Sequence, residues 1–270
     1  MSPNSLQGDV RAAIRAALAA GALLRQFVGR PRTVKTKRSA ADLVTEVDRA
    51  AERLIARLLR RADPTIGFLG EELGRRRERA SSRWIVDPID GTNNFVHGFP
   101  CFAVSIALEV RGTVVVGVIY DPMRRELFVA SQGAGASLNG RPIRVSQTTR
   151  LTQSLLSTGF PVQFRHAARP YLGRFESFER RSHGVRRIGS TTISLASIAA
   201  GRMEGFYEQR LWPWDIAAGI LLVQEAGGRV SNFRGEPPTL TEGRLVASNG
   251  RIHRQMLQLI AGAHLLRRGR

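Results

Sequence analysis

Residues 84–92 read Trp-Ile-Val-Asp-Pro-Ile-Asp-Gly-Thr, an apolar strand that runs into a polar turn. The turn carries Asp87 and Asp90, and a rigid strand end can present both carboxylates as the oxygen ligands that a hard cation such as Mg²⁺ requires. Gly91 and Thr92 begin a predicted short helix, whose first N–H groups attract an anion such as phosphate. Taken alone, the stretch is equally compatible with a strand followed by an Asx-type turn, because Asp, Pro and Gly are common turn residues.

Two further acidic motifs flank this stretch. Gly70-Glu71-Glu72 follows the apolar run 66–69, and Trp212-Pro213-Trp214-Asp215 opens an apolar segment that ends with Glu225-Ala226-Gly227-Gly228. The three motifs, in this order and at this spacing, resemble the inositol monophosphatase family of Mg²⁺-dependent phosphatases. The resemblance extends to residues 42–48 and 246–249, so it covers nearly the whole chain.

The fold that the resemblance implies is α/β (α+β), a layered αβαβα sandwich of the inositol monophosphatase and fructose-1,6-bisphosphatase type. The hydrophobic pattern agrees with this fold, since long helical segments precede a group of strands and a second region alternates strand and helix. We expect an N-terminal α+β part at 1–148 that carries most metal ligands, and a C-terminal α/β part at 149–270 that completes the site. Helices are predicted at 6–27, 42–62, 163–178, 190–201, 215–226 and 250–266. Strands are predicted at 66–69, 83–87, 101–110, 113–120, 126–130, 154–158, 185–188, 204–208 and 244–248, with a polar loop at 29–39.

A cluster of carboxylates fits the hydrolysis of a phosphate monoester by two metal ions. One ion lowers the pKa of the attacking water, and the other stabilises the leaving oxygen. Carboxylates packed this closely would repel one another without cations, so a metal is expected. The resemblance implies a first Mg²⁺ held by Glu71, Asp87 and the backbone carbonyl of Ile89, and a second held by Asp87, Asp90 and Asp215. It also implies a weaker third Mg²⁺ at Glu72, with Asp48 and Lys37 near the metals.

Thr92 is expected to have two roles. Its N–H and that of Gly91 are expected to bind the phosphate at the helix start, and the resemblance implies that its hydroxyl orients the attacking water together with Glu71. The predicted catalytic residues are therefore Glu71, Asp87 and Thr92. Helix capping is the alternative role for Thr92 and for Asp48.

The predicted substrate contacts come from both halves of the chain. Glu208 matches the family's acceptor of an inositol hydroxyl, although an exposed acid at a strand end is the alternative reading. Gly189-Ser190-Thr191 occupies the family's Gly-Thr-Ala position, where two hydroxyl donors are kept but the identity of the polyol is left open. The full predicted set is Asp90, Gly91, Thr92, Gly189, Ser190, Thr191, Glu208 and Asp215.

The composition is that of a basic globular protein. The chain has 41 Lys and Arg residues against 22 Asp and Glu residues, a net charge of +19. Such a charge draws in phosphate-bearing substrates or nucleic acid, although scattered solvated arginine is the simpler account of most positions. No apolar run reaches the roughly 20 residues of a membrane span, and Cys101, the single cysteine, excludes an intrachain disulfide. We therefore predict a cytoplasmic protein with no membrane partner and an inert, buried thiol at Cys101.

Three functions are in competition. The first is Mg²⁺-dependent hydrolysis of inositol monophosphate or a similar polyol phosphate by a Li⁺-sensitive homodimer, as the resemblance implies. The second keeps the reaction but takes histidinol phosphate, an amino-alcohol ester, or another sugar or nucleotide phosphate. The third is binding to RNA or to the transcription machinery, which the net charge motivates. The low aromatic content of 7% and the absence of arginine–aromatic interleaving speak against the third.

Overall fold

The computed structural model describes residues 3–265 apart from four short gaps, at 31–32, 37–42, 77–80 and 162–167. Most helices and strands that the sequence predicts are present within these residues. The helices are α1 (Pro3–Phe27), α2 (Glu46–Ala62), α3 (Thr92–Val96), α4 (Arg169–Glu179), α5 (Thr191–Ala199), α6 (Pro213–Glu225) and α7 (His253–Leu265), with a 3₁₀ turn at Leu151–Gln153.

The larger of the two main sheets has eight strands in the order β10-β9-β8-β7-β6-β5-β3-β4. All neighbours are antiparallel except β3 and β5, which run parallel, so their carboxyl ends meet at one edge. The strands are β3 (Gly67–Gly70), β4 (Gly74–Arg76), β5 (Ser82–Asp90), β6 (Ala103–Val110), β7 (Thr113–Asp121), β8 (Glu126–Ser131), β9 (Ala136–Leu138) and β10 (Arg141–Pro142).

The second main sheet has five strands in the order β12-β11-β13-β15-β14. Its strands β12, β11 and β13 are parallel, and β15 is antiparallel to both of its neighbours. The strands are β11 (Leu155–Thr158), β12 (Gly184–Arg186), β13 (Gly205–Gln209), β14 (Arg229–Ser231) and β15 (Arg244–Ser248). A separate antiparallel pair is formed by β1 (Val34–Thr36) and β2 (Leu43–Thr45).

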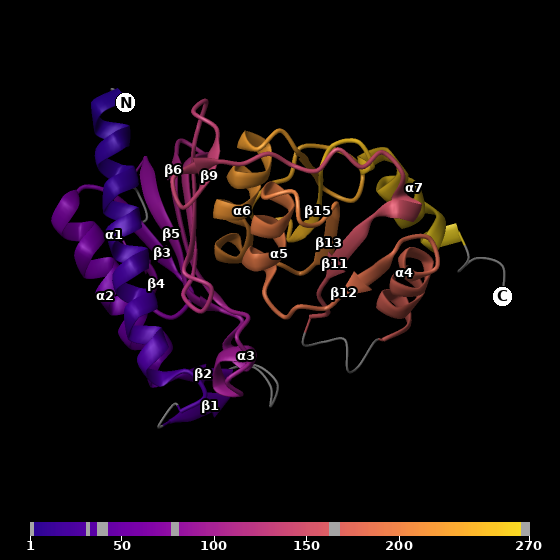
Figure 1. The fold of residues 1–270 in the computed structure, drawn as a ribbon. Coiled ribbons are helices and arrows are strands. Elements are labelled where there is room, and N and C mark those ends of the chain that lie inside the picture. Colours follow the sequence, from indigo (N-terminus) through magenta and orange to yellow (C-terminus); the bar gives the residue numbers. More distant parts are fainter. Residues whose placement is uncertain (1–2, 31–32, 37–42, 77–80, 162–167, 266–270) are drawn as a thin grey trace.

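The elements stack in five layers, which confirms the predicted αβαβα fold (Figure 1). Helices α1 and α2 cover one face of the eight-stranded sheet, while α5 and α6 lie between the two sheets. Helices α4 and α7 cover the outer face of the five-stranded sheet. Layers of this kind let each sheet bury both faces against helices.

One hydrophobic core joins the two sheets through the central helices. It contains Ile85 and Ile119 of the larger sheet, Leu195 and Leu222 of the central helices, and Leu245 of the smaller sheet. The strands of the larger sheet all precede residue 143 and those of the smaller sheet all follow residue 154. The expected division at 148/149 stays a prediction, because both parts share this core.

Several predicted boundaries are wrong for local physical reasons. The helix predicted at 42–62 begins at Glu46, because Thr45 caps it by accepting hydrogen bonds from the N–H groups of Val47 and Asp48. Residues 43–45 instead pair with 34–36, inside the segment predicted as a loop. The strand predicted at 83–87 continues to Asp90 through a bulge.

The remaining differences concern short elements and helix starts. Strands β4, β9, β10 and β14, of two or three residues each, were not predicted. The helix predicted at 163–178 has its described start at Arg169, with Pro170 in its first turn. Among the described residues, no helix is long and apolar enough to cross a membrane. Cys101 is a buried free thiol, and burial raises its pKa to about 11, which fits an inert side chain.

Candidate metal and phosphate site

The parallel strands β3 and β5 bring the first acidic residues together. The N–H of Glu71, directly after β3, donates to the carbonyl of Val86 at 3.3 Å, so Glu71 lies beside Asp87. Asp87 is 2% exposed, and its Oδ1 accepts the N–H of Ile89 at 2.9 Å. The bulge between Asp87 and Asp90 lets both acids leave the same strand end.

Asp90 is held by the start of helix α5, about one hundred residues away along the chain. Its Oδ2 accepts hydrogen bonds from Ser190 Oγ, from the backbone N–H of Thr192 and from Thr192 Oγ1, each at 2.6 Å. All three donors approach one oxygen. The backbone of Thr191 adds a further hydrogen bond to the Asp90 carboxylate.

Asp215 reaches the site from the first turn of α6. Its Oδ2 accepts the N–H of Trp212 at 2.7 Å, which fixes the carboxylate at the helix N-terminus. Trp212 is 45% exposed and stacks on Trp214 with ring centroids 5.5 Å apart, so only Trp214 packs on the core. The apolar segment that follows Trp212-Pro213-Trp214 in the sequence predicts that both indole rings pack against the core near the site, and this prediction is wrong for Trp212.

The pKa shifts show that these acids share one electrostatic environment. Burial and then the charges of Glu71, Asp90 and Asp215 raise the pKa of Asp87 well above its ordinary value. Burial and then Asp90 raise the pKa of Asp215 well above its ordinary value, and burial raises that of Asp90. Mutual repulsion of this kind is relieved by a cation between the carboxylates.

The donor set fits a hard divalent cation. It consists only of oxygen ligands, which Mg²⁺ prefers over nitrogen or sulfur. One carboxylate oxygen of Asp87 accepts the N–H of Ile89, and one of Asp215 accepts the N–H of Trp212. Within the described part of the chain, no three His, Cys, Asp or Glu side chains form a ready-made metal cage. The acids therefore lie near one another without closed coordination.

Thr92 is fixed at the start of α3 by two acceptors. Its Oγ1 lies 3.1 Å from Asp48 Oδ1 and 3.0 Å from the carbonyl oxygen of Ile89. Asp48 is 1% exposed and also closes the capping box of α2 with Thr45, so it combines capping with a contact to Thr92. Gly91 has φ of +99°, and a Cβ there would lie 3.0 Å from the Cys101 carbonyl oxygen, so this turn requires glycine.

The predicted substrate residues lie next to the acids. Burial and then the charge of Asp90 raise the pKa of Glu208 to about 8, and its Oε2 lies 3.4 Å from Thr191 Oγ1. Ser190 is 4% exposed, and it caps α5 by accepting the N–H of Ile193. Because the Ser190 hydroxyl donates to Asp90, a supporting role fits it better than a polyol contact.

Of the residues predicted near a weaker third Mg²⁺, Glu72 is among the described residues and Lys37 is not. The side chain of Glu72 is 4% exposed, and its Oε2 lies 3.9 Å from Arg49 Nε. Lys37 and Asp42 lie outside the described residues.

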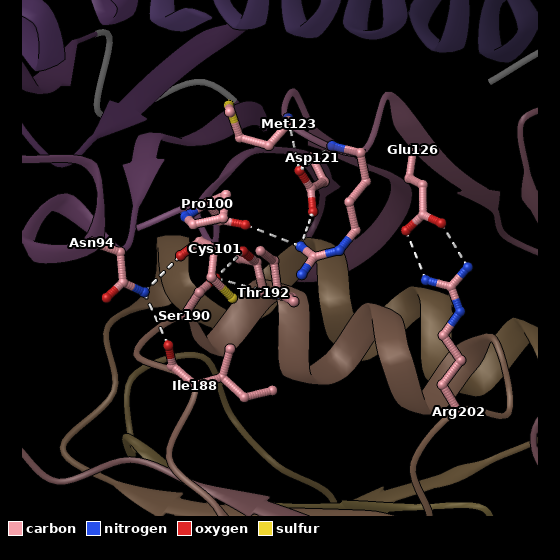
Figure 2. A network of polar contacts seen from close by, with 12 residues as sticks. Asn94, Pro100, Cys101, Asp121, Met123, Glu126, Ile188, Ser190, Thr192 and Arg202 are labelled. Atoms are coloured by element: carbon pink, nitrogen blue, oxygen red, sulfur yellow. Dashed lines mark hydrogen bonds and ion pairs between the residues drawn. The ribbon is translucent and has the colours of Figure 1, made fainter. Parts of the chain in front are cut away.

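Sequence reasoning missed three residues that hold the site together. The Asn94 amide donates to the carbonyls of Cys101 and Ile188 at 2.7 and 2.9 Å (Figure 2), which ties α3 to the segment before α5. Thr192 supplies two of the three donors to Asp90. Glu52 is fully buried on α2, and burial raises its pKa to about 7. The sequence did carry a signal for Glu52, since this acid falls among the apolar positions on one face of the predicted helix.

The comparisons with known proteins agree with this fold. A model of the inositol monophosphatase family matches residues 6–264. The chain is 42% identical to an inositol-1-monophosphatase of Synechocystis over 96% of this chain and 91% of that protein. It is 44% identical to the Nus factor SuhB of Pseudomonas aeruginosa over 94% of this chain and 96% of that protein.

The solved structures agree as well. An inositol monophosphatase from Anabaena superposes with a TM-score of 0.87 at 38% identity, covering 96% of this chain and 97% of that one. The layered fold and its acidic site thus define the class of the protein, a phosphatase-type hydrolase. The chain belongs to the inositol monophosphatase family.

Proposed function

We propose that the chain hydrolyses a small phosphate monoester in a Mg²⁺-dependent reaction, with inositol monophosphate as the substrate. The observation that carries the proposal is the set of four acids, Glu71, Asp87, Asp90 and Asp215. They come from three separate segments. The charges of the other three raise the pKa of Asp87, and those of Asp90 and Glu71 raise the pKa of Asp215. Membership of the family supports a phosphatase activity on a phosphorylated small molecule.

The acids and one carbonyl would hold two Mg²⁺ ions. Glu71, Asp87 and the Ile89 carbonyl would bind the first ion, and Asp87, Asp90 and Asp215 the second. Glu72 would support a weaker third, with Asp48 and Lys37 nearby. When bound, the ions would supply an acidified water and a counter-charge for the leaving oxygen.

The chain's own residues would orient the reactants. Thr92 Oγ1 donates its hydrogen to Asp48 or to the Ile89 carbonyl, so its lone pair is left to accept a hydrogen bond from the attacking water. Glu71 would accept that water's other hydrogen. The N–H groups of Gly91 and Thr92, at the start of α3, would bind the phosphate oxygens. Glu208 and Thr191 would contact a hydroxyl of the polyol, and Gly189 would border the same pocket.

The test measures phosphate release from inositol 1-phosphate with and without Mg²⁺. Asp90→Asn is expected to lower kcat/KM at least about 100-fold, because even partners outside the ligand shell change metal affinity 10–100-fold. Asp63→Asn is the matched control, since Asp63 binds Thr65 near the end of α2 and its variant is expected to keep full activity. Unchanged activity in Asp90→Asn would contradict the proposal.

A panel of esters decides the substrate within this reaction. Inositol 1-phosphate, histidinol phosphate, fructose 1,6-bisphosphate and 3′-phosphoadenosine 5′-phosphate would be ranked by kcat/KM. The half-buried acid Glu208 favours a neutral polyol or an amino alcohol over a highly anionic ligand, since its carboxylate would repel a second phosphate group. The same proposal includes inhibition of the enzyme by Li⁺ and a homodimeric protein in the cytoplasm. Light scattering would measure the mass of the dimer.

A second candidate function rests on a different observation. A relative 44% identical carries the name Nus factor SuhB, and the net charge of +19 would attract RNA. Binding of an RNA hairpin at nanomolar concentration with a steep dependence on salt would support a role in the transcription machinery. Weak binding that is indifferent to RNA sequence would leave the phosphatase as the single function.

A further inference from the structure

Glu52 is a buried acid that the proposed reaction does not use. It is 0% exposed and shares the inner face of α2 with Val47, Ala51 and Ile55. Its Oε2 is buried and has no hydrogen-bond partner among the described residues. Burying an ionisable group costs free energy unless its polar atoms are hydrogen-bonded, and an apolar side chain would avoid this cost. The contacts of the other carboxylate oxygen therefore matter.

The other oxygen of Glu52 binds the turn that follows β3. Its Oε1 accepts the N–H of Glu72 at 3.2 Å, and the N–H of Leu73 also bonds the carboxylate. These N–H groups belong to the turn between β3 and β4, twenty residues further along the chain. Glu52 thus supplies an acceptor for backbone N–H groups of a partly buried turn.

Gly70 provides the space for this contact. A Cβ at position 70 would overlap Glu52 Oε1 and crowd the ring of Phe68. Gly70 does not have a positive φ, so the glycine is needed for space and not for backbone conformation. The glycine of Gly70-Glu71-Glu72 is therefore explained by the Glu52 carboxylate.

Helix α2 also contacts the start of α3, through an acid that lies one helical turn before Glu52. Asp48 lies four residues before Glu52, on the same helix face, and accepts the hydroxyl of Thr92 at 3.1 Å. The two carboxylates therefore connect one rigid helix to both loops of the site. Because their separation along α2 is about 6 Å, the helix fixes how far apart the two loops lie.

We propose that Glu52 is a positioning residue, which holds the turn at Gly70-Glu71-Glu72 so that Glu71 is directed at the metals. The inference rests on the proposed function, because it assigns Glu71 to the metal site. It predicts that removing the Glu52 acceptors weakens cation binding more than it changes substrate binding.

The test measures cation affinity without turnover. Tb³⁺ is a hard, oxygen-preferring cation whose luminescence is excited through a nearby indole, and Trp212 is bonded to Asp215. Glu52→Met keeps the length of the side chain and removes both acceptor oxygens. We expect the Kd for Tb³⁺ to rise about 10–100-fold, and the Mg²⁺ concentration for half-maximal phosphate release to rise by a similar factor. The KM for inositol 1-phosphate at saturating Mg²⁺ is expected to change less than about threefold.

Two further variants approach the same contact. Glu52→Gln keeps one carbonyl acceptor for the turn, so it is expected to hold the Tb³⁺ affinity within about threefold of wild type. Gly70→Ala displaces the Glu52 carboxylate from the other side and is expected to weaken Tb³⁺ binding as Glu52→Met does. If Glu52→Met does not fold, the contrast between these two variants decides the question.

Glu204→Met is the matched control. Glu204 is also buried, and its Oε2 accepts the N–H of Leu155 at 2.7 Å, outside the site. This variant is expected to lower the Tm and leave Tb³⁺ affinity unchanged. The inference is overturned if Glu52→Met leaves the Tb³⁺ affinity unchanged, or if Glu204→Met lowers it equally. In either case, Mg²⁺-dependent activity of the wild-type chain would still uphold the proposed function. A wild-type chain that neither binds Tb³⁺ nor hydrolyses the ester with Mg²⁺ overturns both.

Discussion

The Oδ2 atom of Asp90 accepts a hydrogen bond from Ser190 Oγ at 2.6 Å, and this contact joins the end of β5 to the start of α5. Ser190 lies at the N-cap of α5 and Asp90 at the last position of its strand. The residues that cap a helix therefore also fix a proposed metal ligand (Figure 2 shows Ser190 and Thr192). The stability of this junction and the orientation of Asp90 depend on the same few hydrogen bonds.

Thr192→Val tests this junction, because it removes one hydroxyl donor to Asp90 and keeps the backbone donor and the shape. We expect the free energy of unfolding to fall by about 1–2 kcal/mol, since the partly buried Asp90 carboxylate loses a charge-assisted hydrogen bond. Urea denaturation measures the change. Thr152→Val, at an exposed position, is expected to stay within about 0.5 kcal/mol of wild type. Equal effects in the two variants would contradict the assignment.

Glu208→Gln tests the proposed polyol contact. The KM for inositol 1-phosphate is expected to rise about tenfold or more, because a half-buried carboxylate acceptor for a hydroxyl is lost. Phenyl phosphate has no hydroxyl on its leaving group, so its KM is expected to stay within about threefold. Steady-state kinetics on both esters gives the comparison. A rise of the same size for both would mean that Glu208 acts on the phosphate or the metals.

Two glycine-to-alanine variants are expected to have opposite effects. Gly91→Ala places a Cβ at φ of +99° and 3.0 Å from the Cys101 carbonyl oxygen, so unfolding should become easier by about 1–3 kcal/mol. Gly173 lies inside α4, and a Cβ there meets nothing within 4 Å. Gly173→Ala is therefore expected to stabilise the protein by about 0.5–1 kcal/mol. Thermal denaturation of the pair measures both signs, and stabilisation by Gly91→Ala would show that the turn tolerates a side chain.

His253 predicts a pH-dependent stability away from the candidate site. Its ring nitrogens contact Ser231 and Ser248 at 2.9 Å, and burial and then Arg229 lower its pKa from 6.5 to about 4. The unfolded chain takes up a proton as the pH falls below 6.5, whereas the folded chain does so only near pH 4. The contribution of His253 is thus complete above pH 6.5 and is lost as the pH falls toward 4, with an upper limit of about 3 kcal/mol.

The measurement for His253 is urea denaturation between pH 4 and 8. Other acids also titrate in this range, so the informative quantity is the difference between wild type and His253→Gln. The variant is expected to be less stable at neutral pH and to lose less stability on acidification. Parallel curves for the two proteins would contradict the assignment to His253.

The sequence was enough to predict most of the longer helices and strands in their order, and the acids that it singled out lie close enough for their charges to raise the pKa of Asp87. Asp87 and Asp90 follow an apolar strand, and the apolar periodicity of the flanking helices requires layers on both sides of that strand. Local contacts determine boundaries that the apolar periodicity does not show. The cap at Thr45 places the helix start four residues later than predicted. Residues 34–36 form a strand within the predicted basic loop, because they pair with residues 43–45. Short strands of this kind carry too few residues to show a period.

The support of the site was harder to predict than its acids. Ser190 was expected to face a polyol, yet its hydroxyl donates to Asp90, and this direction depends on a contact across one hundred positions. Asn94 and Thr192 give no local signal, since amides and hydroxyls near helix starts usually serve as caps. Trp212 was expected to pack against the core, and instead it lies at the N-cap of α6, stacks on Trp214 and is 45% exposed.

The late place of α6 in the chain has a consequence for protein synthesis. Translation proceeds from the N-terminus at about 5–20 residues per second, so β3 and β5 leave the ribosome before Ser190, Thr192 or Asp215 exists. On the proposed assignment, a nascent polypeptide cannot attack any ester until 215 of its 270 residues have been made. Products terminated before Asp215 therefore lack the last proposed metal ligand.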